Sequence, residues 1–213
     1  MKRRYEKGGM FSEKGRDKFY HEKKQILRKM YWEGNDGSDV YRPNGFSEYP
    51  CEIYNVFLNL IDHDGNVIDL GCGNGLMLCH LVTRSNYKLT PYGVDFIEES
   101  IEQAKKVILP KYAENFTVAN IVDIDLGFNF FDFIFFDPYD VHPDDLRSMI
   151  NKLLKTCKPG GKIVFYTYPD VLVGLSLKRR SRLEWVGDLL PPEIARKLKR
   201  IDHEEVSVGV YET

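Results

Sequence analysis

Short apolar runs alternate with amphipathic segments along most of this 213-residue chain. The apolar runs have the length and the aromatic and β-branched content of strands, and they lie at 67–70, 92–95, 116–119, 131–136 and 162–166. Residues 131–136 are apolar at all but one position, which is typical of a strand buried on both faces. Helical periodicity predicts the helices between the strands, at 52–61, 76–83, 98–108 and 143–157.

The alternation of strands and helices indicates the fold class. Strand–helix–strand units pair their strands in parallel, with right-handed crossovers. We therefore expect a doubly wound α/β fold, with a mostly parallel sheet and helices on both faces. Towards the C-terminus the pattern predicts a helix at 192–200 and a last strand at 204–211. The predicted domain covers residues 51–213 and follows an extension over residues 1–50.

The N-terminal extension combines helical periodicity with loop composition. Residues 19–32 carry an apolar side at helical spacing, and Gly34, Gly37 and Gly45 follow them. Aromatic residues mixed with glycines suit a lid that opens and excludes water, so we expect residues 19–46 to cover the acceptor side of a site. A helix packed on the back of the sheet is the alternative.

Charge is distributed unevenly along the chain. The formal net charge is −2, but residues 1–30 carry +7 and the remainder carries −9. A second basic cluster lies at 178–182, and such clusters can bind nucleic acid. The basic residues of the first segment recur at helical spacing, so a solvated helix face is the favoured interpretation.

Cysteine usage and hydropathy limit the class of protein. The four cysteines include no C-x-x-C pair, which argues against a zinc site and against a disulfide framework. No apolar run is long enough to span a membrane, and the basic N-terminus is not followed by the apolar region of a secretory signal. We expect a cytoplasmic protein with no metal ion and no membrane contact.

The most informative segment is Val-Ile-Asp-Leu-Gly-Cys-Gly-Asn-Gly at 67–75, where an apolar strand ends in an acid and runs into three glycines. Such a turn brings the backbone close to a nucleotide-like ligand. Leu76 stands where a dinucleotide fingerprint requires its third glycine. Asp69 would repel a pyrophosphate, but it would accept a strong hydrogen bond from an ammonium group. The loop therefore favours a ligand with an adenosine body and a cationic tail, a description that fits S-adenosylmethionine.

The residues Asp-Leu-Gly-Cys-Gly-Asn-Gly at 69–75 resemble the first motif of the class I S-adenosylmethionine-dependent methyltransferases. The resemblance spans residues 50–168, the core of the family fold. It implies S-adenosylmethionine as the cofactor and a cofactor loop made of Asp69, Gly71, Cys72, Gly73, Asn74 and Gly75.

Ligands of open α/β sheets bind at the carboxyl ends of the strands, so polar residues there are site candidates. Asp95 closes the second predicted strand, where a carboxylate can accept hydrogen bonds from both ribose hydroxyls. Phe96 follows it and is placed to cover one face of the adenine. Capping of the next helix is a second role for Asp95, compatible with the first.

Asn120 closes the third predicted strand. The methyltransferase family usually has Asp at this position, in contact with the adenine amino group, and the Asn side-chain carbonyl can accept the same hydrogen bond. Ile121 would offer its backbone N–H to the adenine ring. A turn asparagine is the alternative for Asn120.

The segment Asp137-Pro138-Tyr139-Asp140 follows the fourth predicted strand and resembles a shortened D-P-P-Y motif of amine and amide N-methyltransferases. The resemblance implies that Asp137, at the cofactor edge, holds a target nitrogen and that Tyr139 stacks on its flat group. The second proline of that motif is missing here. His142 is a candidate general base, and capping of the helix that starts at Pro143 is its alternative role.

The expected activity is methyl transfer from S-adenosylmethionine, and a small molecule is the favoured acceptor. RNA or protein methylation, using the basic N-terminal helix and residues 178–182, is one alternative. A non-catalytic scaffold subunit that binds S-adenosylmethionine is another. In each enzymatic case the protein mainly positions the nucleophile, because the sulfonium already activates the methyl group.

Overall fold

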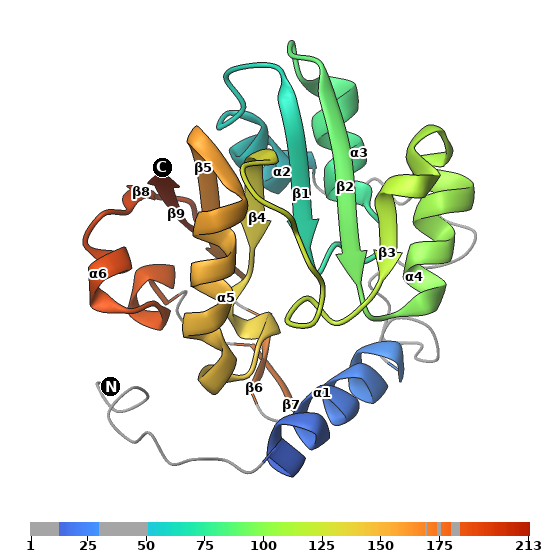
Figure 1. The fold of residues 1–213 in the computed structure, drawn as a ribbon, viewed down its shortest axis with the longest axis vertical. Coiled ribbons are helices and arrows are strands. Elements are labelled where there is room, and N and C mark those ends of the chain that lie inside the picture. Colours follow the sequence, from blue (N-terminus) through green and yellow to red (C-terminus); the bar gives the residue numbers. More distant parts are fainter. Residues whose placement is uncertain (1–12, 30–50, 169, 174–175, 180–183) are drawn as a thin grey trace.

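The computed structural model describes residues 13–29, 51–168, 170–173, 176–179 and 184–213. A seven-stranded sheet forms its centre, with the strand order β3-β2-β1-β4-β5-β9-β8 (Figure 1). Its strands are β1 (Gly65–Leu70), β2 (Leu89–Asp95), β3 (Phe116–Val118), β4 (Phe131–Phe136), β5 (Cys157–Thr167), β8 (Lys199–Ile201) and β9 (Ser207–Glu212). A separate hairpin pairs β6 (Asp170–Val173) with β7 (Ser176–Arg179).

The strands from β3 to β5 run parallel, and β8 and β9 complete the sheet in antiparallel pairings. The helices are α1 (Glu13–Arg28), α2 (Cys51–Leu58), α3 (Leu76–Arg84), α4 (Glu98–Gln103), α5 (Pro143–Thr156) and α6 (Pro192–Ala195). The doubly wound α/β fold with a helical N-terminal extension is thereby confirmed. The order of β3, β2, β1 and β4 reverses direction at β1, which is where such sheets bind ligands.

Both faces of the sheet are buried, as the apolar run of β4 predicts. Phe133 and Phe135 face a cluster that includes Leu78 of α3, whereas Ile134 and Phe136 face a cluster that includes Met149 of α5. These four side chains of β4 are all 0 % exposed. A strand with an apolar side chain on both sides needs a helical layer on each, which is why the chain winds in both directions from β1.

Several predicted elements have different bounds in the structure. Helix α1 begins at Glu13, before the predicted start at Phe19. Strand β5 begins at Cys157, five residues before the predicted start at Lys162. Cys157 pairs with Phe131, and the register shifts before Phe133. The prediction for residues 192–200 is partly wrong, because α6 ends at Ala195 and Lys199–Ile201 form β8.

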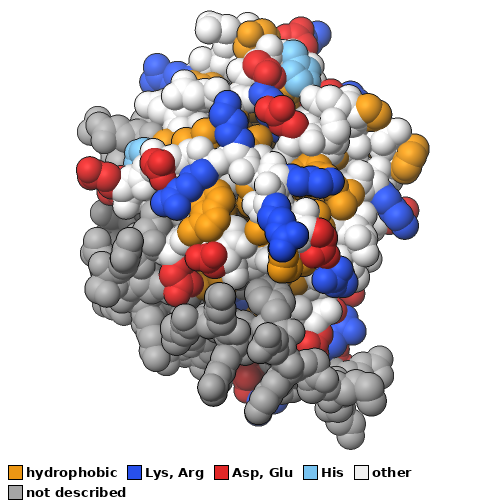
Figure 2. All heavy atoms as spheres, turned by 90° about the vertical axis from the view of Figure 1, so that its left-hand side faces the viewer, with side chains coloured by type: hydrophobic (Ala, Val, Ile, Leu, Met, Phe, Trp, Pro, Cys, Tyr) orange, Lys and Arg blue, Asp and Glu red, His pale blue; other side chains and the backbone are white. Residues whose placement is uncertain are grey.

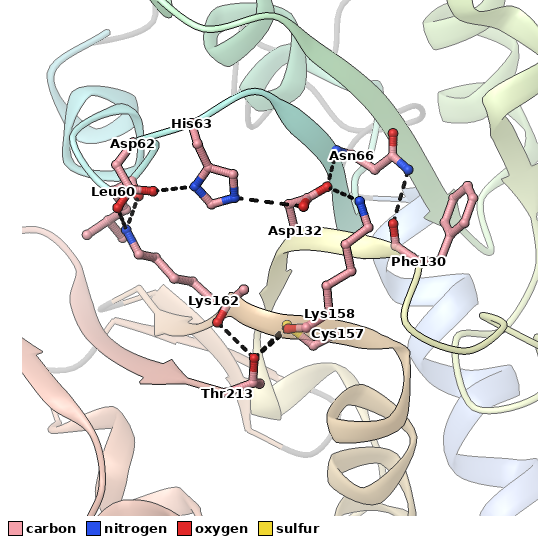
Figure 3. A network of polar contacts seen from close by, with 11 residues as sticks. Leu60, Asp62, His63, Asn66, Phe130, Asp132, Cys157, Lys158, Lys162 and Thr213 are labelled. Carbon is pink, nitrogen blue, oxygen red and sulfur yellow. Dashed lines mark hydrogen bonds and ion pairs between the residues drawn. The ribbon is translucent and has the colours of Figure 1, made fainter.

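A polar network joins β1, β4 and β5 at the amino end of the sheet, opposite the strand ends that carry the predicted site (Figure 3). Asp132 accepts hydrogen bonds from the Asn66 backbone N–H at 2.7 Å and from the Lys158 ammonium at 2.8 Å. His63 lies between the carboxylates of Asp62, at 2.7 Å, and Asp132, at 3.7 Å. Because these contacts tie three strands together far from the site, we interpret the network as structural.

Among the described residues, none of the helices has the length and apolar character needed to cross a membrane.

Candidate active site

The glycine loop after β1 has the backbone conformation that its sequence predicts. Gly71, Gly73 and Gly75 have φ angles of +91°, +53° and +79°, in the region that side chains disfavour. The backbone N–H groups of Gly71 and Cys72 donate to the Val94 carbonyl at 2.8 and 3.1 Å, so the loop is anchored to β2. Helix α3 starts directly afterwards, which gives the strand, turn and helix order of a nucleotide-binding unit.

Asp69 lies beneath this loop and is 3 % exposed. The Tyr166 hydroxyl of β5 donates a hydrogen bond to Asp69 Oδ1 at 3.3 Å. Burial raises the pKa of Asp69 to about 8, and the nearby negative charge of Asp140 adds to the rise. A carboxylate in this state is stabilised by an incoming cation, so the electrostatics of the site suit the ammonium group of the predicted ligand.

Asp95 is 7 % exposed at the carboxyl end of β2. Its two oxygens accept hydrogen bonds from the backbone N–H of Gly73, at 2.9 Å, and of Ile97, at 2.8 Å. Burial raises its pKa to about 6, against the opposing effect of these bonds. Asp95 therefore organises the glycine loop and the entry to α4, and it stands beside that loop, as its predicted ribose role requires.

The other predicted loop residues are held by the protein itself. Cys72 is buried within the core, and burial raises its pKa well above the usual value. Asn74 is 2 % exposed, and its amide donates to Gln103 Oε1 at 3.0 Å. Phe96 is half-buried at the start of the loop into α4.

Asn120 lies two residues beyond the end of β3, in a turn. Its side-chain oxygen accepts the Val122 N–H at 3.4 Å, and its carbonyl accepts the Asp123 N–H at 3.0 Å. Ile121 is 5 % exposed in the core. The Lys152 ammonium of α5 donates to the carbonyls of Val122 and Ile124 at 2.7 and 2.8 Å, which fixes the turn. The adenine contacts of Asn120 and Ile121 stay predictions.

The segment after β4 forms a short 3-10 turn, Pro138–Asp140, capped by Asp137. Asp137 Oδ1 accepts the Tyr139 N–H at 2.9 Å, and the Tyr139 hydroxyl donates to Glu184 Oε2 at 3.1 Å. His142 is 7 % exposed, and its Nδ1 accepts the Asp144 N–H at 3.3 Å as the cap of α5. The structure thus brings Asp137, Tyr139 and His142 onto the carboxyl edge of β4.

Helix α1 crosses this same edge of the sheet, at the end towards which β1 and β2 point (Figure 1). The Lys23 ammonium lies 2.8 Å from Asp140 Oδ1 and 2.9 Å from the Tyr139 carbonyl oxygen. The Tyr20 hydroxyl donates to Asp145 Oδ2 at 2.7 Å and accepts the His142 N–H at 3.0 Å. The placement at the site edge, rather than on the back of the sheet, is the one that the cover prediction requires. Of the predicted cover, residues 30–46 lie outside the described residues.

Sequence reasoning missed several residues of this region. Tyr166 carried a usable signal, because it lies near the carboxyl end of a predicted strand, as Asp69 and Asp95 do. Asp140 belongs to the recognised motif but stands where that motif has no acid. Lys23 and Glu184 gave no local signal, since only the fold brings them to Asp140 and Tyr139.

Comparisons with known proteins agree with this geometry. A family described as "Methyltransferase domain" matches residues 61–186, more than half of the chain. The chain belongs to this methyltransferase family. This membership, with the glycine loop and the buried Asp69, makes it a class I S-adenosylmethionine-dependent methyltransferase. No match was found among curated proteins.

Solved structures share the fold at low sequence identity. N-methyltransferase NodS from Bradyrhizobium japonicum is 16 % identical with a TM-score of 0.59, over 89 % of this chain and 96 % of that one. An RNA methyltransferase from Salinibacter ruber is 15 % identical with a TM-score of 0.53, over 78 % and 93 %. A SAM-dependent methyltransferase from Aquifex aeolicus is 18 % identical with a TM-score of 0.54, over 78 % and 93 %.

The residues of the methyltransferase site fit the cofactor. Glycine at positions 71, 73 and 75 permits the positive φ angles of the turn, and these three residues put no side chain of their own between the loop backbone and a ligand. Asp69 and Asp95 are buried carboxylates at the ends of β1 and β2, where the predicted acceptors for an ammonium group and for ribose hydroxyls would have to lie. The bound cofactor supplies a methyl group activated by a positively charged sulfur.

Proposed function

We propose that this methyltransferase acts on a small molecule held between α1 and the segment that follows β4. The observation that carries the proposal is the position of α1 across the carboxyl edge of the sheet. Phe19 packs against the His142 ring at 5.1 Å, and Lys23 is buried against Tyr139 and Asp140. A helix packed this closely over the acceptor segment suits an enclosed small acceptor better than a polymer surface.

The charges of the same helix support this choice over RNA or protein. Arg16 pairs with Asp145 at 2.7 Å, Lys23 with Asp140 at 2.8 Å, and Arg28 with Glu99 at 2.5 Å. These basic groups are therefore used to dock α1 on the domain. Groups engaged in this way contribute less to an electrostatic footprint for nucleic acid.

The face around α6 and β8 has a similar character. Figure 2 shows Lys and Arg intermixed with Asp and Glu there, with hydrophobic side chains between them. Arg147 pairs with Glu193 at 2.7 Å, and Arg200 pairs with Asp202 at 2.6 Å. Mixed charge gives no broad positive field on this part of the surface. Residues 180–182 of the basic cluster at 178–182 lie outside the described residues.

In this proposal the chain's own residues position the acceptor. Asp137 and Tyr139 line the acceptor side, and the hydrogen bond from Tyr139 to Glu184 fixes the orientation of the phenol ring. Displacement at the activated methyl group needs an aligned nucleophile at close range, so orientation is the main contribution of these side chains. A base is required only for an acceptor that must lose its proton early, such as a hydroxyl.

A single substitution can separate a role of His142 as general base from its role as the cap of α5. Asn is also a good helix cap, so His142→Asn keeps the start of α5 while removing the imidazole. If His142 acts as a base, the transfer rate should fall about 100-fold or more with unchanged cofactor affinity. An unchanged rate would confine His142 to capping.

The acceptor class can be tested with S-adenosylmethionine labelled in its methyl group. The purified protein would be incubated with small-molecule, RNA and protein fractions of a cell extract, and label in each fraction would be counted. We expect label in the small-molecule fraction, reduced in Tyr139→Phe but not by a change of the exposed Lys18. Label confined to RNA or protein would contradict the proposal.

A further inference from the structure

Lys23 is a buried charge that the fold brings to the cofactor loop. Its side chain is 8 % exposed, although it belongs to a helix on the outside of the domain. Among the described residues, its ammonium donates to Asp140 Oδ1 and to the Tyr139 carbonyl. These bonds use two of its three N–H groups. Burial of a lysine is costly, and the ion pair with Asp140 offsets part of that cost.

The partner of Lys23 lies directly against the glycine turn. A Cβ atom built on Gly71 would stand 2.5 Å from Asp140 Oδ2, so the carboxylate occupies the space that the glycine leaves open. The negative charge of Asp140 raises the pKa of both Asp69 and Asp95, and Lys23 lowers that of Asp95. Both members of the ion pair are therefore within electrostatic reach of the cofactor site.

The amino-acid tail of the cofactor carries one ammonium and one carboxylate. A site that excludes water must offer a partner of opposite sign to each charge. Asp140 lies against the Gly71 turn, Asp69 precedes that turn near the end of β1, and Lys23 supplies positive charge beside Asp140. Among these groups, Lys23 is the donor suited to a carboxylate.

We propose that Lys23 and Asp140 bind the tail of the cofactor, Asp140 accepting from its ammonium together with Asp69, and Lys23 donating to its carboxylate. The proposal rests on the cofactor of the family and is independent of the acceptor. It gives α1 a direct role in cofactor binding, since a residue of the covering helix completes the site.

The test compares two ligands that differ only in the carboxylate, S-adenosylmethionine and decarboxylated S-adenosylmethionine, by titration calorimetry. The wild-type protein should bind the decarboxylated compound about tenfold more weakly. In Lys23→Met, affinity for S-adenosylmethionine should fall about tenfold, and the two ligands should bind equally. Lys18→Met is the matched control, because it removes the same charge from a 71 % exposed side chain of α1.

A second control separates ligand binding from docking of α1. Tyr20→Phe removes the bond to Asp145 but keeps Lys23, so it should change the affinities for both ligands by the same factor. If Lys23→Met also weakens both ligands equally, Lys23 acts through docking and the proposal is wrong. Unchanged or tighter binding of S-adenosylmethionine in Lys23→Met would overturn it as well.

Asp140→Asn tests the other half of the pair, even if Lys23→Met fails to fold. We expect about tenfold weaker binding of S-adenosylmethionine and unchanged binding of 5′-methylthioadenosine, which lacks the amino-acid tail. Equal losses for both compounds would show that Asp140 only shapes the turn. Unchanged binding of both would remove Asp140 from the site.

Discussion

The buried carboxyl groups of Asp69 and Asp95 make the stability of the cofactor-free protein depend on pH. Their pKa values are raised to about 8 and about 6, mainly by burial. Between the usual Asp pKa, near 4, and these values, the folded protein holds protons that the unfolded chain has released. The free energy of unfolding must therefore fall as pH rises through this window.

The first prediction concerns this decrease of the free energy of unfolding with rising pH. Without cofactor, the free energy of unfolding should decrease by about 2 kcal/mol or more between pH 5 and pH 8. In Asp69→Asn the decrease between pH 6 and pH 8 should be much smaller, because the amide does not titrate. Urea denaturation at several pH values measures both quantities. A parallel decrease in the variant and the wild type would show that Asp69 is charged throughout.

Asp95 carries the second residue-scale prediction. Asp95→Ala should weaken binding of S-adenosylmethionine by about 2 kcal/mol, because it leaves the ribose hydroxyls without a charged acceptor and frees the Gly73 N–H. Titration calorimetry gives the dissociation constant, and circular dichroism checks the fold. An unchanged constant in a folded variant would restrict Asp95 to organising the loop.

At the scale of elements, polar contacts fix both ends of the sheet, but in different ways. The carboxyl end holds the buried carboxylates Asp69 and Asp95 of the cofactor site. At the amino end, Asp132 accepts hydrogen bonds from the Asn66 N–H and the Lys158 ammonium (Figure 3). Gly65 is required there, because a Cβ atom would lie 2.4 Å from Asp132. The two ends should therefore respond differently to substitution.

Asp132→Ala should lower the free energy of unfolding by about 2 to 3 kcal/mol, since it leaves the Asn66 N–H and the Lys158 ammonium without their acceptor. Cofactor affinity should stay unchanged, because the network lies at the opposite edge. Asp202→Ala is the control: its side chain is 81 % exposed, and its change should stay within about 0.5 kcal/mol. Equal effects of the two variants in urea denaturation would contradict the role of the network.

At the scale of the whole molecule, the N-terminal extension and the domain meet at the active site. Helix α1 reaches the start of α5 through Asp145 and the start of α4 through Glu99. It thus spans the edge where β1, β2 and β4 end (Figure 1). A cover attached at both sides is expected to affect the acceptor step more than the cofactor step.

Removal of residues 1–46 tests this division. Cofactor affinity should survive within about tenfold, roughly 1.4 kcal/mol, which includes the loss expected for Lys23. Turnover of the acceptor found in the labelling experiment should disappear. Full turnover by the truncated protein, or an insoluble product, would show that the extension is dispensable or purely structural.

The sequence by itself determined the α/β core and the cofactor loop, because both depend on local signals. The apolar run of β4 predicts a strand that is buried on both faces. The positive φ angles of the loop favour glycine at positions 71, 73 and 75. The strand ends then predict where Asp69 and Asp95 meet, since parallel strands end at one edge.

Tertiary structure alone decided the remaining features. Residues 199–201 pair with β9, so cross-strand hydrogen bonds override the helical tendency of the local sequence. Lys23 and Asp140 are 117 positions apart, and no local pattern predicts a contact formed by docking α1 across the sheet. Such contacts depend on how the helices and strands pack against one another, and this packing depends on the whole folded chain rather than on any one segment.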